Sequence, residues 1–425
     1  MRNIQKLIVS TLLTIIFSCS NDDVLKDINS IENEKTSAQQ MSKTTNNNGL
    51  KYSQSKLIIQ YQPGTSQAVK GNLRDFYNVV SFEICKHCPD EMIEMWDFGE
   101  PIDIEPKKEV IEDNPTNEGG FMNTAGIYAI RDVDYEFKIP ATNNFTNTPI
   151  ISDLATDYVS FIKGSNTGIN IAVIDTGIDT SLTEFGSPFL YNASGTDLEA
   201  EGVLSGWNFV DNTNDTYDDN SGKHGTVISK IIEQELTNLG IDFQIMPIKA
   251  FDANGEGSYF DVLCATNLAL NYTNVVNMSF GWYDDNFGDF ANTIFSNLLT
   301  THSNVSVITS AGNISNNNDI NKHYPSGYPQ DNLFSIAATK PDHSYIADYS
   351  NYGAVSVDYF ASGHFSLSGH DYYGTSFAAP KATSLISSFG TESYYIDIIS
   401  SINSISPNTN FGLQYPVKYN RVIIQ

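Results

Sequence analysis

The chain is poor in basic residues and cysteines and almost lacks long apolar runs. Its 425 residues include 23 Lys or Arg against 50 Asp or Glu, so the formal net charge is -27. So acidic a surface repels polyanions, and we expect no nucleic-acid partner and little attraction to anionic lipid. At this length the chain can bury a sizeable core and is expected to hold two or three domains.

The apolar run Leu7 to Phe17 is too short to span a bilayer. Arg2 and Lys6 precede it, a pattern that predicts a secretory signal. The run ends in Ser18-Cys19 and resembles a bacterial lipoprotein cleavage site, which implies a signal peptide over residues 1–19 with Cys19 as the lipidated residue. An ordinary signal peptide is the alternative. We expect an exported cell-envelope lipoprotein, and the following Ser-Asn-Asp-Asp resembles the surface-export signal of Bacteroidetes lipoproteins.

Only Cys85, Cys88 and Cys264 remain once Cys19 is assigned to lipid. Cys85 and Cys88 have CxxC spacing, but a zinc site would need a second pair, which the sequence lacks. We expect a local disulfide between Cys85 and Cys88 or two free thiols, and a core position for Cys264.

Residues 20–49 are mainly polar and are predicted to form a flexible tether. Residues 50–140 predict a small α+β domain, with an acidic loop around Glu105 to Gly119. Its expected strands and helix are Lys56–Tyr61, Ser66–Tyr77 (the helix), Val79–Cys85, Met92–Phe98, Ile127–Ile130 and Tyr135–Ile139.

Residues 145–425 predict an α/β domain, because apolar strands alternate with helical patterns. Continuous apolar runs such as Val275 to Met278 indicate strands covered on both faces, as in a mostly parallel sheet flanked by helices. After a helix-like segment at 148–163, the expected elements are Ile169–Ile174, Val227–Leu236, Phe243–Ala250, Phe260–Leu270, Val275–Phe280, Asp289–Leu299 and Val305–Ser310.

Three polar residues occupy positions suited to nucleophilic catalysis. Ser376 follows Gly374-Thr375 at a predicted helix start, where its hydroxyl is expected to be exposed and Pro380 to lie in the first turn. A serine nucleophile needs a histidine base and a carboxylate to orient that base. Asp175 ends a predicted buried strand, and His224 begins a helix between two glycines, Gly222 and Gly225.

These three motifs, in the order Asp175, His224, Ser376, resemble those of the subtilisin-like serine proteases. Ser310-Ala311-Gly312-Asn313 adds a fourth match, which implies that the Asn313 amide belongs to the oxyanion hole. By the same resemblance, Ser279-Phe280-Gly281 and Gly255-Glu256-Gly257 are the two backbone edges that hold an extended substrate, and Ala311 and Gly312 line the pocket beside the scissile bond. The domain at 50–140 resembles an inhibitory propeptide by position, with an independent accessory domain as the alternative.

The resemblance implies a subtilisin-like fold and a secreted, lipid-anchored serine endopeptidase. A leader-peptide maturation protease of narrow specificity and a catalytically silent binding protein are the alternatives. The implied partners are a protein or peptide substrate, the chain's own propeptide, and the membrane through the lipid; a cut near Pro140 would release the catalytic domain.

We expect no cofactor and no catalytic metal. The Asp/Asn-rich run Asp211 to Asn220 has the hard oxygen ligands of a calcium site, but it also has the composition of a solvated loop.

Overall fold

The computed structural model describes residues 52–88, 92–112, 121–131, 168–181, 200, 202–203, 205–283, 294–390, 395–409 and 414–424. Every described residue belongs to one compact unit, Asn46–Gln425. The predicted signal peptide with Cys19, the tether, the strand at 135–139, the junction near Pro140 and the helix at 148–163 lie outside the described residues. No helix in the described ranges has both the length and the apolar character needed to cross a membrane.

Eight parallel strands form the main sheet, in the order β17-β14-β13-β11-β9-β5-β7-β6. The strands are β5 (Ile169–Asp175), β6 (Trp207–Asn208), β7 (Phe243–Lys249), β9 (Val275–Met278), β11 (Ser306–Ser310), β13 (Leu333–Thr339), β14 (Tyr359–Ser362) and β17 (Val422–Ile423). Most are buried along their whole length, as the continuous apolar runs predicted. The predicted parallel α/β sheet is confirmed.

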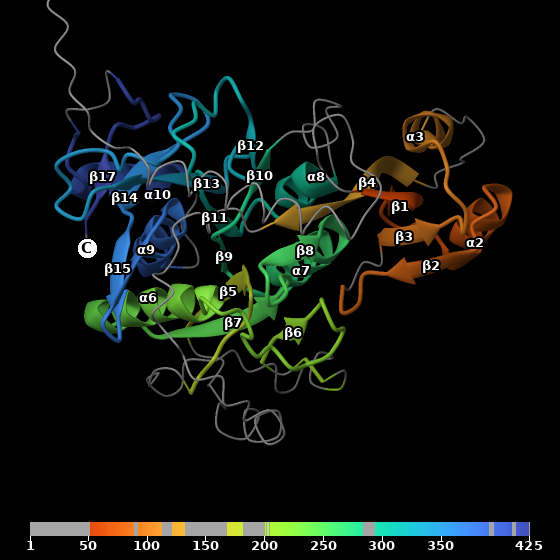
Figure 1. Cartoon of the computed structure of the whole chain (residues 1–425), viewed down its shortest axis with the longest axis horizontal. Coiled ribbons are helices and arrows are strands. Elements are labelled where there is room, and N and C mark those ends of the chain that lie inside the picture. Colours follow the sequence, from red (N-terminus) through yellow and green to blue (C-terminus); the bar gives the residue numbers. More distant parts are fainter. Residues whose placement is uncertain are drawn as a thin grey trace, which may run out of the picture. The chain divides into compact units, whose positions relative to one another are not determined.

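Helices cover both faces of this sheet. Side chains of successive strand residues point to opposite faces, so neighbouring residues of one strand belong to different core clusters. Ala172 and Ile174 share one core cluster with α7 (Tyr259–Tyr272) and α8 (Ile294–Thr301). Ile171 and Val173 belong to the cluster on the other face, which includes three helices. Those helices are α6 (His224–Leu239), α9 (Thr375–Ser388) and α10 (Tyr395–Ile405). Within that layer α6 and α9 pack against each other, which Figure 1 shows.

Residues 52–131, here called the N-terminal module, form the expected α+β arrangement. It comprises β1 (Tyr52–Tyr61), α2 (Gln67–Phe76), β2 (Ser81–Ile84), β3 (Ile93–Asp97), α3 (Ile104–Glu112) and β4 (Phe121–Arg131). Its strands pair antiparallel in the order β2-β3-β1-β4. One side of this sheet packs on α2 and α3 through a core of its own that includes Leu57 and Trp96. From the other side, Ile58 and Ile93 join the core cluster of α7 and α8.

The predicted acidic loop at Glu105 to Gly119 is wrong in its first half, because α3 occupies residues 104–112. Pro106 is the third residue of this helix, where its missing N–H is one of the donors left without an intrahelical acceptor anyway. Ile111 is fully buried in the core of the module, so tertiary packing supports a helix that the local composition did not indicate.

One strand of the module's sheet also pairs with the α/β domain. The end of β4 pairs antiparallel with β8 (Glu256–Ser258), with Ile130 opposite Gly257 and Arg131 opposite Glu256. β4 therefore connects β1 at one end to β8 at the other, and Figure 1 shows the gold strand between the orange module and the green β8. Two short antiparallel pairs complete the described strands: β10 (Trp282–Tyr283) with β12 (His323–Tyr324), and the hairpin of β15 (His364–Leu367) with β16 (His370–Tyr373).

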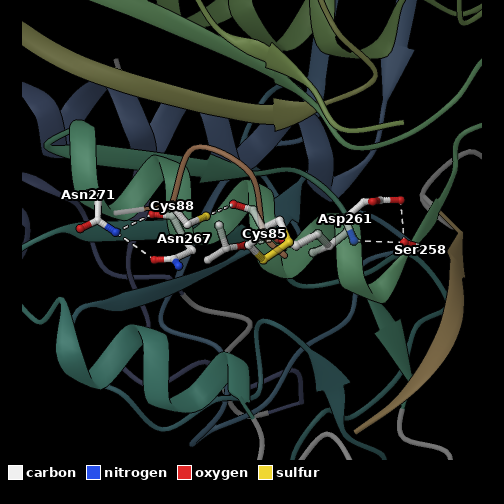
Figure 2. Close-up of a disulfide and its surroundings, with 9 residues drawn as sticks. Cys85, Cys88, Ser258, Asp261, Asn267 and Asn271 are labelled. Carbon is white, nitrogen blue, oxygen red and sulfur yellow. Dashed lines mark hydrogen bonds between the residues drawn. A yellow bond between two sulfur atoms is a disulfide. The ribbon is translucent and has the colours of Figure 1, made fainter. Parts of the chain in front are cut away.

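Both expectations for the CxxC pair are wrong, because Cys85 forms a disulfide with Cys264, 179 residues away. Figure 2 shows this bond between the loop after β2 and the middle of α7. Cys264 is buried, as expected, but it is not a simple core thiol. Cys88 keeps its thiol outside this disulfide, and it is buried in the same apolar cluster as the two bonded cysteines. The sequence could not reveal this pairing, since it depends on how the module docks on α7.

Candidate active site

Asp175 and His224 form a buried pair at the carboxyl edge of the main sheet. Asp175 is the last residue of β5, and His224 is the first residue of α6. The Nδ1 atom of His224 lies 2.8 and 2.9 Å from the two Asp175 carboxylate oxygens. A carboxylate only accepts hydrogen bonds, so Nδ1 carries the proton and the imidazole orientation is fixed.

The N-terminus of α6 is held by side chains from outside the helix. The Gly225 N–H donates to Thr176 Oγ1 at 3.0 Å, and the Thr226 N–H donates to Asp218 Oδ2 at 3.1 Å. Thr226 Oγ1 also donates to Asp218 Oδ2, at 2.7 Å. Burial raises the pKa of Asp218, and the Thr226 bonds oppose this rise. These contacts satisfy donors that a helix start leaves open, and they hold His224 over β5.

Gly225 allows α6 to approach β5 this closely. A Cβ atom at this position would lie 2.3 Å from the Gly177 carbonyl oxygen and 3.1 Å from the Asp175 Cβ. Real carbon atoms do not approach a backbone oxygen so closely, so any side chain here would push His224 away from Asp175. Close packing of α6 on β5 thus requires a glycine at position 225, which the sequence pattern alone did not show.

Ser376 lies at the N-terminus of α9, one residue after the helix begins at Thr375. It is fully buried, so the expectation of an exposed hydroxyl is wrong. The helix packs against β9 and β11, two inner strands of the main sheet. There Ser376 Oγ donates to the Ser279 carbonyl oxygen at 2.9 Å. The ring of the next residue, Phe377, packs edge-on against His224 with centroids 5.6 Å apart, which ties the serine helix to the histidine.

Pro380 lies beyond the first turn of α9, contrary to the prediction, because it is the sixth residue of the helix. A proline there removes the N–H that would bond to the carbonyl of Ser376, four residues earlier. Ser279 Oγ donates to that carbonyl at 2.9 Å. The hydroxyl of Ser279 thus satisfies the acceptor that Pro380 releases, and a helix with an internal proline persists.

Asn313 is positioned by Thr375, a residue that sequence reasoning did not select. Asn313 Oδ1 accepts from the Thr375 N–H at 2.8 Å and from Thr375 Oγ1 at 2.9 Å. Thr375 Oγ1 in turn accepts from the Gly312 N–H at 3.1 Å. With Oδ1 held in this way, Asn313 Nδ2 lies on the side of Gly374, 3.4 Å from the place of a Cβ there. No local pattern marks Thr375 for this role, since its partners are about 60 residues away in the sequence.

The other predicted site residues gather around the same edge of the sheet. Ala311 and Gly312 directly follow β11, and Ser279, Phe280 and Gly281 lie between β9 and β10. The Phe280 ring packs into the core against Phe251, with centroids 4.7 Å apart, so only its backbone can serve a substrate. Glu256 and Gly257 lie on β8, where they pair with β4, and Gly255 precedes them.

Three carboxylates of the predicted calcium segment bind residues outside it. Asp218 binds Thr226, Asp219 pairs with buried Lys249 at 2.7 Å, and Asp211 Oδ2 accepts from Asn208 at 2.9 Å. In the part of the chain that the structure describes, no three His, Cys, Asp or Glu side chains gather as a metal would require. Calcium in this segment stays a prediction.

The parallel sheet, with the Asp175–His224 pair and Ser376 at one edge, defines a subtilisin-like α/β protein. The model of the subtilase family matches residues 166–388, and the chain belongs to this family. The chain is 30% identical over 245 residues to a thermophilic serine proteinase from Bacillus sp. (strain AK1), which covers 54% of each chain. It is 27% identical over 234 residues to a subtilisin-like protease from Coccidioides posadasii, and this match covers 52% of each chain. The chain thus spans about half the length of these relatives.

Similarity to a solved structure extends beyond the family match. The epidermin leader peptide processing serine protease from Staphylococcus aureus aligns with a TM-score of 0.53 and 14% identity. This alignment covers 86% of the present chain and 97% of the solved one. At this level of identity the comparison shows a shared fold, and the predicted subtilisin-like fold is confirmed.

Proposed function

We propose that this chain is a serine endopeptidase that hydrolyses peptide bonds through Asp175, His224 and Ser376. The observation that carries the proposal is the hydrogen bond of His224 Nδ1 to both oxygens of buried Asp175. With the proton on Nδ1, the second ring nitrogen is the basic one and can accept the proton of a serine hydroxyl. Membership of the subtilase family supports the same assignment.

In the proposed reaction, the Ser376 hydroxyl leaves the Ser279 carbonyl and donates to His224. The oxygen then attacks the substrate carbonyl carbon while His224 takes the proton, and Asp175 stabilises the imidazolium. The charge that develops on the carbonyl oxygen is met by Asn313 Nδ2 and by the Ser376 N–H at the start of α9. Collapse of this intermediate expels the amine, protonated by His224, and leaves an acyl-enzyme that water hydrolyses.

We further propose that the N-terminal module acts as an inhibitory propeptide. The support is the pairing of β4 with β8, because β8 contains two residues of the backbone edge expected to bind substrate. A strand of the chain itself on this edge competes with a peptide for the same hydrogen bonds. The alternative of an independent accessory domain predicts that removing the module leaves peptidase activity unchanged.

Export and lipid anchoring at Cys19 belong to the proposal on the strength of the N-terminal sequence alone. A Cys19→Ser variant is expected to move from the membrane fraction to the soluble fraction, because it cannot carry the lipid. If the unmutated protein is already soluble without detergent, an ordinary signal peptide is the better interpretation.

A narrower function, maturation of a leader peptide, is the activity that the name of the Staphylococcus aureus neighbour states for that protein. Because the likeness to it is one of fold, this function stays a prediction. Cleavage profiling separates the two functions: a general endopeptidase cuts many peptides, whereas a maturation protease cuts one class of leader and leaves the rest intact.

The proposed chemistry is tested by labelling with a fluorophosphonate probe, which reacts with an activated serine. Ser376→Ala should abolish labelling and peptide hydrolysis, while Ser384→Ala, a buried serine on the same helix, should retain both. Each protein is assayed with and without dithiothreitol, because reduction breaks the bond between the N-terminal module and α7. A folded wild-type chain that stays silent in both conditions would instead be a subtilisin-fold binding protein.

A further inference from the structure

Three cysteines lie together where the N-terminal module meets the catalytic domain. The disulfide joins Cys85, at the end of β2, to Cys264 in the middle of α7, with their Cα atoms 5.1 Å apart. The thiol of Cys88 donates to the carbonyl oxygen of Cys264 at 3.6 Å, and Figure 2 shows its sulfur beside the disulfide. All three residues are almost fully buried in one apolar cluster.

We propose that these residues form a thiol–disulfide exchange site that controls the covalent attachment of the N-terminal module, with Cys88 as the resolving thiol. Cys85 would have two alternative partners: Cys264 on the catalytic domain and Cys88 in its own loop. The first partner ties the module to the enzyme, and the second frees it. The exchange itself is independent of peptidase activity; only its effect on that activity rests on the proposed function.

The loop from Cys85 to Cys88 has the geometry for the second pairing. Lys86 and His87 form a turn, and His87 has the left-handed backbone angle φ of 60°. Chain ends across a four-residue turn come within about 7 Å. Disulfides join Cα atoms about 4.4 to 6.8 Å apart, so the local pair needs little backbone movement. The His87 ring packs on Trp207, with centroids 4.0 Å apart, which holds this loop on the catalytic domain while the module is docked.

The exchange needs no external oxidant or reductant. The Cys88 thiol loses its proton, and the resulting thiolate attacks Cys85 Sγ. A Cys85–Cys88 bond forms, the Cys85–Cys264 bond breaks, and its electron pair leaves on Cys264 Sγ, which then takes up a proton. One disulfide and one thiol are present before and after, so the oxidation state of the protein does not change.

Docking of the module restrains this exchange. In the docked state the Cys88 sulfur faces the Cys264 carbonyl oxygen, which can only accept a hydrogen bond and disfavours a thiolate, and the surrounding core shields it from water. Only the thiolate attacks a disulfide, so a buried thiol in apolar surroundings is inert. Loosening the module exposes Cys88 to water, and exchange then completes the release. The site therefore keeps a docked module attached and makes its detachment lasting.

The Cys85–Cys264 disulfide changes the effect of a backbone cut between the N-terminal module and the catalytic domain. A cut after residue 131 leaves the module linked to α7 through Cys85–Cys264. An inhibitor held this way stays at an effective concentration of about millimolar, so inhibition would persist after cleavage. The expected escape of the catalytic domain from a Cys19 lipid anchor would likewise need both the cut and the exchange.

The test uses the full chain with Ser376→Ala, which prevents self-cleavage, and with Cys19→Ser, which leaves only these three cysteines. A site for an unrelated sequence-specific protease is inserted after Pro140 and cut. On a denaturing gel without reductant, after thiols are blocked, the two fragments are expected to run as one species, and reduction should separate them. Peptide mapping should find the blocking group on Cys88 alone.

Exchange is then started by opening the module in mild urea at alkaline pH and followed by timed blocking of thiols. The expected result is that the blocking group moves from Cys88 to Cys264, at a constant one thiol per chain, while the fragments separate without reductant. A matched Cys88→Ser chain should stay linked under the same conditions. The proposal is overturned if Cys88→Ser separates as fast, if Cys264 never becomes the free thiol, or if the untreated protein already contains a Cys85–Cys88 bond. Because the assay uses an inactive serine variant, its outcome does not depend on the proposed peptidase activity.

Discussion

Acid should destabilise this protein through His323, a buried histidine of β12. Its side chain is fully buried, and burial lowers its pKa to about 3. Ser326 Oγ donates to the His323 carbonyl oxygen at 3.1 Å and therefore accepts from Nδ1–H, which lies 2.7 Å away. The ring is also held tightly, since a Cβ on Gly281 would lie 2.2 Å from it. The folded protein thus holds a neutral imidazole with no room for a hydrated cation.

The size and sign of the effect follow from linkage between proton binding and folding. An unfolded histidine has a pKa of about 6.5, so between pH 6.5 and pH 3 the unfolded chain binds a proton that folded His323 does not. The contribution of neutral His323 to the free energy of unfolding is therefore fully present at neutral pH and is lost as the pH falls. Between pH 7 and pH 5 the loss should be about 2 kcal/mol.

Urea unfolding at pH 7, 6 and 5 measures this effect, in a Ser376→Ala background to avoid self-digestion. His323→Asn keeps an amide N–H for Ser326 and cannot titrate, so it should be less stable at pH 7 but lose about 2 kcal/mol less on acidification. His343→Asn is the control, because His343 is only partly buried and its lowered pKa should matter less. If the parent and His323→Asn lose stability in parallel, the neutral buried state inferred for His323 is wrong.

Three further predictions concern the site and the module interface. Asn313→Ala should lower kcat about 100-fold or more, the size known for the matching donor of a subtilisin, with little change in KM; a change in KM alone would make Asn313 a ground-state contact. Ser279→Ala removes the donor to the Ser376 carbonyl that Pro380 releases, and thermal unfolding should report a loss of about 1 to 3 kcal/mol. Asp261 has its pKa raised to about 6, mainly by burial, so the folded state binds its proton more tightly and stability should fall as the pH rises from 4 to 6. Asp261→Asn should remove about 2 kcal/mol of this dependence between pH 4 and pH 6, and a parent curve that is flat in the same window would contradict it.

Some expectations failed where the deciding contact is distant in the sequence. Cys85 and Cys88 are three residues apart and invite a local interpretation, but the structure pairs Cys85 with a residue on α7. Ser376 is expected to be exposed because it lies at a helix start, yet α9 begins inside the domain and Ser376 is fully buried. Thr375, which orients the Asn313 amide, carries no local signal, because Asn313 is 62 residues away.

The sequence by itself determined the parallel α/β class and the places of Asp175, His224 and Ser376. Those features are local: a buried strand is a continuous apolar run, and the polar residue at its end lies at the edge of the sheet. Only the tertiary structure decided what surrounds them, namely the buried hydroxyl of Ser376, the pairing of β4 with β8 and the disulfide to α7. These depend on how separate elements pack, and packing joins residues through space whose separation in the sequence leaves no pattern to read.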